Sequence, residues 1–443
     1  MATKRIVSRR AGFLSCYFTD HLLAFATKAD GRSRRGRTWK NPIPLFKVAL
    51  LCLAAGCKGL TEAEELMQDM PRWVRKMIGL PRWVSDTTLR SFLCKAVPEE
   101  LCKLLYVVGY DAWRRGALRY VEDLPFHVMS LDGKYPSVSD VGESDNHEKS
   151  EYLQVHHHEN TKEPTHGLVR TVTATLVSAI GRPIMAATPI LGATNEQGSF
   201  KQAFGELVRH YGRLFTMVMY DAGATSLGNA DAVIKAGKHY FFQVTNPEWV
   251  MYQTMELLFR GKPSTVSVEE EVSSVKRVVR ELTILPVIQT AKNLTLWKHA
   301  RSIVKVYSET YTDGEFKSSK TRYFITSMES SRLSAFQWLR LVILRWGVET
   351  SHGILDMRNG FNEDNCPWIH ADANGNLVVQ ILRRIVYTLI TLYRSVTLRN
   401  EEESLAPWRR QLEWFKETLK FSCKEVFENL RTRIYKVPPA FVS

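Results

Sequence analysis

The first third of the chain has the apolar spacing of short helices. Pro44–Ala55 is apolar on nearly every side, which predicts a buried helix. Thr61-Glu-Ala-Glu64 is a capping box and predicts the start of a second helix. A third helix is predicted over Ser85–Leu93, with a polar outer side that includes Thr88 and Arg90. Such a series favours a helix-turn-helix-like DNA-binding unit. A helical bundle that only packs on the next domain fits the same pattern.

From Pro125 the apolar period shifts towards two. We predict strands over residues 126–132, 168–177, 183–190, 214–221 and 239–245, and helices over residues 195–211 and 229–237. Three consecutive strands followed by alternating helices and strands indicate an α/β fold, a mixed sheet with helices on its faces.

Two of the predicted strands end in an acid. Asp132 is followed by Gly133, and Asp221 is followed by Ala-Gly. A carboxylate at the end of a buried strand lies at the edge of the sheet, where α/β proteins place their functional sites. The alternative is that each Asp only caps its strand or begins a turn.

The region 247–330 reads as a mainly β insertion, with a hairpin turn at Asp313-Gly314. One long helix is predicted from Ser331 to Arg358. On it, Arg345, Glu349, His352 and Asp356 share one face, by helical spacing. Because the rest of this helix is apolar, we expect Glu349 to be buried and to need a partner, for which a metal ion is one candidate.

The charge of the chain is concentrated at one end. The 443 residues have a net charge of +14, and residues 1–120 contain 22 Lys/Arg and 10 Asp/Glu, which is +12. The densest part is a Gly-containing stretch that predicts a basic arm able to neutralise phosphates, with Arg32, Arg34, Arg35 and Arg37 as its contacts. A solvated run of charge is the alternative.

The seven cysteines form no CxxC pair, which disfavours a disulfide framework or a zinc ribbon and fits a reducing compartment. The longest apolar stretch that we identify, Val48–Gly56, is far below the roughly 20 residues of a membrane span. No signal peptide is evident at the N-terminus. We therefore expect a cytoplasmic protein.

Five segments in order resemble the DDE transposases of bacterial insertion sequences, within the H-repeat-associated group of the insertion-sequence-four superfamily. They are Leu131–Lys134, Asp221–Ala224, Arg345–His352, Leu355–Met357 with Asn362–Asn365, and Arg32–Arg37 with Asp86–Arg90. The chain departs from related transposases at four positions, where Tyr, Lys, Asn and Lys are usual: Val342, Asp356, Thr350 and Thr245. These departures leave the three acids intact.

The resemblance implies an RNase H-like fold and a site with two Mg²⁺ ions, for which Mn²⁺ can substitute. Asp132 would bridge both ions, Asp221 would hold one, and Glu349 the other. Glu363 and Asp364 would order the site from outside the ligand shell, although a helix-capping role fits them equally. Arg345 would hold a phosphate or pair with Glu349, and His352 would contact the scissile phosphate or have a structural role.

The implied function is a transposase that binds the inverted-repeat ends of its element as a homodimer, cuts there and joins the 3′ ends to target DNA. It would be cytoplasmic and associated with the bacterial nucleoid. The alternatives are an inactive or domesticated DNA-binding descendant, and a nuclease of the same fold without strand transfer. The expected segments are a basic arm (1–42), a helical DNA-binding domain (43–120), two parts of a catalytic domain (121–246 and 331–400), the β-rich insertion (247–330) and a helical tail (401–443).

Overall fold

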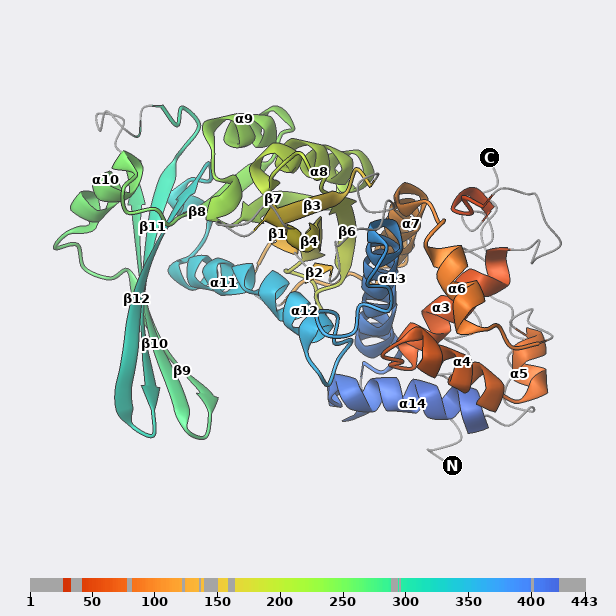
Figure 1. Ribbon diagram of the computed structural model, residues 1–443. Coiled ribbons are helices and arrows are strands. Elements are labelled where there is room, and N and C mark those ends of the chain that lie inside the picture. The colour runs from red at the N-terminus through yellow and green to blue at the C-terminus, as the bar shows by residue number, and fades with distance from the viewer. Residues whose placement is uncertain are drawn as a thin grey trace.

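The computed structural model describes residues 27–32, 42–77, 82–121, 124–134, 137–138, 150–157, 164–287, 294, 296–399 and 402–421. Within them lies a nine-stranded mixed sheet in the order β6-β5-β1-β7-β8-β12-β11-β10-β9. Helices cover both faces of this α/β sheet, and a group of N-terminal helices packs beside its β6 end (Figure 1).

Strands β6, β5, β1, β7 and β8 form one half of this sheet, with β6 at its edge. Strands β1 (His127–Lys134), β5 (Thr171–Leu176) and β6 (Ile184–Pro189) make an antiparallel meander. Strands β7 (Phe215–Tyr220) and β8 (His239–Val244) then run parallel to β1. Helices α8 (Glu196–Tyr211) and α9 (Leu227–Lys235) provide the two crossovers. The predicted strands and helices of this region are confirmed, with one exception.

The exception is the strand predicted over residues 168–177, which is two strands. Residues 164–169 form β4 (Pro164–Val169), which pairs in a separate small sheet with β2 (Ser137–Val138) and β3 (Leu153–His157). The chain breaks at Arg170, whose guanidinium donates to the carbonyls of Leu191, Gly192 and Thr194. These contacts, all from Nη2, hold the backbone in the turn that separates β4 from β5.

The predicted insertion contains α10 (Val250–Phe259) and the strands β9 (Val266–Ser273), β10 (Lys276–Pro286), β11 (Ser302–Thr312) and β12 (Glu315–Thr326). Strand β12 pairs antiparallel with β8, so the insertion extends the main sheet. The predicted hairpin turn is confirmed, because Asp313 and Gly314 both have positive φ, at 53° and 80°.

The single helix predicted from Ser331 to Arg358 is wrong. The structure has α11 (Ala335–Arg345) and α12 (Gly347–Asp356), separated at Trp346. The Trp346 N–H bonds back to Ile343 O, which tightens the last turn of α11. Gly347 then packs on Val177, where a side-chain Cβ would lie only 3.0 Å from Val177 Cγ1. This close approach directs α12 across β1 and β5.

The N-terminal helices are α3 (Pro42–Ala54), α4 (Leu60–Asp69), α5 (Arg72–Met77), α6 (Asp86–Leu93) and α7 (Pro98–Arg114). The predicted capping box at Thr61 is not formed: α4 begins earlier, at an extended Gly59, and the Glu62 carboxylate accepts a bond from Lys58 N at 3.0 Å. The helix predicted over Ser85–Leu93 is confirmed as α6, and Ser85 caps it, since its Oγ accepts from Thr88 N.

Helix α13 (Ala373–Leu392) lies between these helices and the sheet, packing on α3, α6, α7 and β6. With the π-turn that follows, it is long and apolar enough to cross a membrane, and its most apolar window is entirely buried inside the protein. Core helices of soluble proteins have the same length and composition, so this finding is weak evidence for a membrane span. Near the C-terminus, α14 (Trp408–Phe421) packs on α3.

Candidate active site

Asp132 and Asp221 lie next to one another at one edge of the sheet. In the parallel pair β1–β7, Ser130 is opposite Met219, and each acid follows two residues later. Side chains alternate along a strand, so both carboxylates are on the face where Val128, Met217 and Met219 pack against α11. The predicted meeting of two carboxylates at this edge therefore agrees with the register. Asp221 also caps the following turn, because its Oδ1 accepts from Gly223 N at 2.8 Å.

The pKa of Asp221 shows which charges surround it. Burial raises this pKa, and the negative charges of Asp132 and Glu349 raise it further. The Gly223 N–H and the Arg345 guanidinium act in the opposite direction. The three predicted acids and Arg345 thus share one electrostatic neighbourhood, in which like charges are held together against their repulsion.

We expect Asp221→Asn to stabilise the metal-free protein, because it removes a repelling charge while its amide oxygen can still accept from Gly223. We expect a gain of roughly 0.5–2 kcal/mol in the free energy of unfolding, the size of common single stabilising substitutions. Urea unfolding in the presence of a chelator measures it. A loss of stability would mean that the charge of Asp221 stabilises the fold, which would contradict the expected repulsion.

His352 lies against Asp132 and not against solvent. Its Nδ1 is 3.3 Å from Asp132 Oδ2, and the ring is buried. Among the described residues, Nε2 has no hydrogen-bond partner. The preceding residue, Ser351, links α12 to β5, because its Oγ lies 3.2 Å from Thr175 Oγ1. The expected contact of His352 with a scissile phosphate stays a prediction, whereas the geometry makes it an orienting partner of Asp132.

Glu349 pairs with Arg345. Of the two roles expected for Arg345, binding a phosphate or pairing with Glu349, the structure therefore favours the second. The Arg345 Nη2–Glu349 Oε1 distance is 3.0 Å. The expectation that Glu349 is deeply buried is wrong: its side chain is 53% exposed, and Arg345 is the buried partner at 9%. The reason is the helix break, because Glu349 lies in the first turn of α12, where a carboxylate also favours the helix dipole.

Lys134 links the end of β1 to the end of α12. Its ammonium group bonds Asp356 and also Asp364, the latter at 3.1 Å. The sequence analysis missed this cluster, although a signal existed: Lys134 follows Asp132 by two positions and therefore shares its face of the strand. Asp364 was expected to order a metal site. In the structure it bonds Lys134, on the strand that carries Asp132.

Glu363 lies elsewhere, inside the protein. Its carboxylate is 3.0 Å from Arg384 and 4.0 Å from Arg383, and all three side chains are essentially inaccessible. Arg384 Nε also lies 3.4 Å from the hydroxyl of Thr173, which is opposite Asp132 in the sheet. Glu363 therefore supports the site only through Arg384. It does not cap α13, whose N-cap is Asp372.

The predicted DNA-binding residues of the N-terminal region differ in their surroundings. Arg32 bonds Asp30 at 2.7 Å and lies over the Phe92 ring, so its charge is already paired. The three other arm residues, Arg34, Arg35 and Arg37, lie outside the described residues. Arg90 is exposed on α6, whereas the Thr88 hydroxyl is half-buried and bonds the Ser85 cap.

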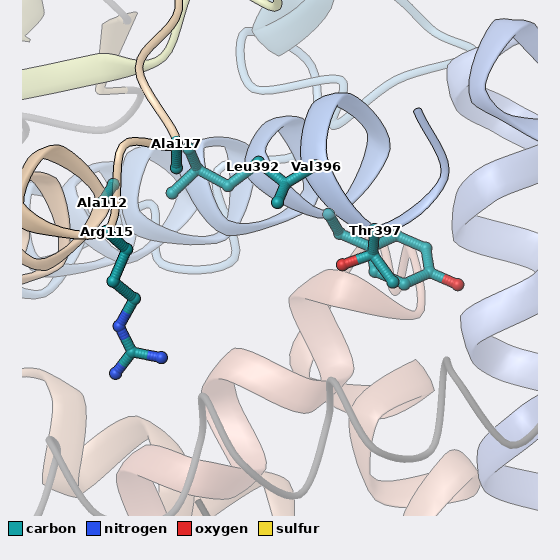
Figure 2. Close-up of a pocket in the computed structure, with 7 residues that line it drawn as sticks. Ala112, Arg115, Ala117, Leu392, Val396 and Thr397 are labelled. Carbon is teal, nitrogen blue, oxygen red and sulfur yellow. The ribbon is translucent and has the colours of Figure 1, made fainter. Parts of the chain in front are cut away.

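Sequence analysis also missed Arg322, a residue of β12 that carried no motif. Its guanidinium lies 4.8 Å from the Trp346 ring centroid, beside the Arg345–Glu349 pair. A pocket of about 60 Å³ lies elsewhere, between α7 and the end of α13 (Figure 2). Its lining contains no predicted site residue: Ala112, Arg115, Ala117, Leu392, Tyr393, Val396 and Thr397.

Comparisons with known proteins identify no family. No family model matches the chain, and no curated protein matches it. Among solved structures, the chain is similar to piggyBac transposase in a cryo-EM synaptic complex with hairpin DNA, with a TM-score of 0.45 and 11% sequence identity over 97% of this chain and 86% of that chain. A likeness of this size establishes neither the family nor the activity of the chain.

Proposed function

We propose that this protein is a DNA transposase of the DDE type, which cleaves DNA at the ends of its element and joins the 3′ ends to target DNA. The observation that carries the proposal is the placement of Asp132 and Asp221 at adjacent strand ends, where burial and the nearby charges of Asp132 and Glu349 raise the pKa of Asp221. Repelling carboxylates held together are typical of catalytic or metal-binding sites.

The strand order supports the RNase H-like part of the proposal. An antiparallel meander of β6, β5 and β1, continued by β7 and β8 in parallel, places the ends of β1 and β7 side by side. The five sequence motifs support the same family. In this reading, the insertion of β9–β12 separates the second acid from the third.

The donor set fits Mg²⁺ in its chemistry, because this ion prefers a few carboxylate oxygens and keeps water and phosphate as its other ligands. Among the described residues, no three His, Cys, Asp or Glu side chains converge closely enough to hold an ion. Glu349 is turned towards Arg345. Asp132 and Asp221 would be the first ligands. Glu349, which is exposed, would join them if its carboxylate left Arg345 and bound the ion. Bound there, two such ions would supply nucleophile activation and leaving-group stabilisation.

The remaining residues orient this site. His352 Nδ1 fixes the Asp132 carboxylate, and Lys134 ties the end of β1 to α12. Arg90, which is exposed on α6, would read the element's end. The arm residues Arg34, Arg35 and Arg37 would add affinity for DNA of any sequence. Arg345, released from Glu349, would face a phosphate. Two copies of the chain would bring two element ends together.

The test is an assay with DNA that carries the sequences flanking the coding region, with Mg²⁺ or Mn²⁺ present. Cleavage followed by joining of the 3′ ends to a target plasmid is the expected result. Hydrolysis without joined products would favour the nuclease of the same fold. Binding without metal-dependent cleavage would favour the inactive descendant.

A further inference from the structure

The ribbon formed by β9–β12 projects past the edge of the sheet at which the acids lie. Strand β8 ends at Val244, which is opposite Tyr323 of β12. Residues 315–322 of β12 therefore continue beyond the end of β8, on the same side as Asp132 and Asp221. The strands extend well beyond α11, away from the remaining helices (Figure 1).

One face of this ribbon is continuous with the face that holds the acids. Val306 is opposite Arg322, and Val306 belongs to the same buried cluster as Met217 and Met219 of β7. Alternation places Lys320 on this face with Arg322. Ser308 is opposite both Lys320 and Arg280, so Arg280 lies in the same row.

The charges of this row are coupled to the site. Burial lowers the pKa of Arg322, the neighbouring Arg345 lowers it further, Glu349 raises it, and Arg280 lowers it again. Positive charge therefore continues from the Arg345–Glu349 pair through Arg322 to Arg280. Lys320 is exposed in the same row, and Arg280 is partly neutralised by its pair with Glu270.

The opposite face of the ribbon has a different charge. Glu309, Glu281 and Glu269 lie there by the strand register. Arg277 pairs with Glu269 at 2.8 Å and lies over the Tyr311 ring. The three glutamates thus share the face away from the site with Arg277 and Lys305, whereas Lys320, Arg322 and Arg280 share the face towards it with Glu270.

We propose that the ribbon face carrying Lys320, Arg322 and Arg280 binds the phosphate backbone of duplex DNA. The DNA bound there would be the segment next to the phosphodiester bond that is cleaved at Asp132 and Asp221. The inference rests on the proposed function, and it adds a binding surface made by the insertion. Cations in extended rows match the regular spacing of backbone phosphates, and their contacts release counterions without reading sequence.

The experiment compares two double variants that remove the same charge from opposite faces. Lys320→Ala with Arg322→Gln changes the proposed face, and Lys305→Ala with Arg277→Gln changes the other. Binding of a duplex of arbitrary sequence is measured in a chelator over a range of salt concentrations. We expect the first pair to reduce the slope of log K against log salt by about 1.8, or about 0.9 for each lost contact, and the second pair to leave it unchanged.

Equal slopes for both pairs, or an unchanged slope for the first, would overturn the inference. Lys320→Ala alone serves as a second variant, because this exposed side chain can be removed without disturbing the fold. The slope is measured without metal and without cleavage. Absence of cleavage in the wild-type protein would therefore contradict the proposed function, whereas the slopes separately decide the ribbon face.

Discussion

Glu349→Gln is expected to abolish metal-dependent DNA cleavage while fold and DNA binding are retained. The amide has nearly the same shape as the carboxylate and lacks only its charge. Loss of a group that stabilises transition-state charge lowers the rate by about 10²–10³-fold, and we expect at least this for a metal ligand. Because the side chain is largely exposed, the substitution leaves no cavity. Cleavage and equilibrium binding of the same DNA are measured side by side.

The matched control for this prediction is Asp356→Asn. Asp356 lies seven residues further along the helix, about 10.5 Å by helix rise, and bonds Lys134. Asp364 still accepts from Lys134 when Asp356 is changed, so we expect substantial activity. Robust cleavage by Glu349→Gln, or loss of cleavage in Asp356→Asn alone, would show that Glu349 is not the third catalytic acid.

Glu363→Gln is expected to destabilise the protein by about 3–5 kcal/mol, because it leaves the buried guanidinium groups of Arg383 and Arg384 without their counter-charge. This is a large part of the roughly 5–15 kcal/mol that stabilises a typical protein. Urea unfolding gives the free energy. The double variant Glu363→Gln with Arg384→Met should lose less than the two single variants together, since it also removes one stranded charge.

Glu413→Gln provides the comparison for a surface pair. Glu413 of α14 accepts from Arg409 at 2.8 Å; Arg409 is exposed and Glu413 is partly exposed. Such pairs contribute only about 0–1 kcal/mol. If Glu363→Gln were as mild as Glu413→Gln, the buried cluster would not be a determinant of stability, and its contact with Thr173 would be incidental.

Local chemistry was sufficient to predict much of the central sheet. The Asp313-Gly314 pair specified a hairpin turn because both of its residues tolerate positive φ. Period-two patterns located β1, β6, β7 and β8 to within one or two residues. The same patterns failed at Arg170, where the strand ends because of hydrogen bonds to a loop about 20 residues away. No local pattern contains that information.

The candidate site shows the same division. Asp132 and Asp221 were identifiable because each follows an apolar strand, whereas their side-by-side placement depends on the β1–β7 register. Glu349 was selected by spacing from Arg345, yet the assumed burial was wrong because α12 begins anew at Gly347. The contacts of Lys134 and Arg322 could not be identified from local sequence, because their partners, Asp364 and Trp346, lie further along the chain.

By itself, the sequence determined the element types, the turn at Asp313, the concentration of positive charge before Val121 and the identity of the candidate acids, because these depend on neighbouring residues and composition. Only the tertiary structure decided where α11 ends, which of Arg345 and Glu349 is buried, and which face of the ribbon continues the site. These follow from close packing, such as that of Gly347 on Val177, and from strand register. Both are set by contacts between residues far apart in the chain, which local patterns do not encode.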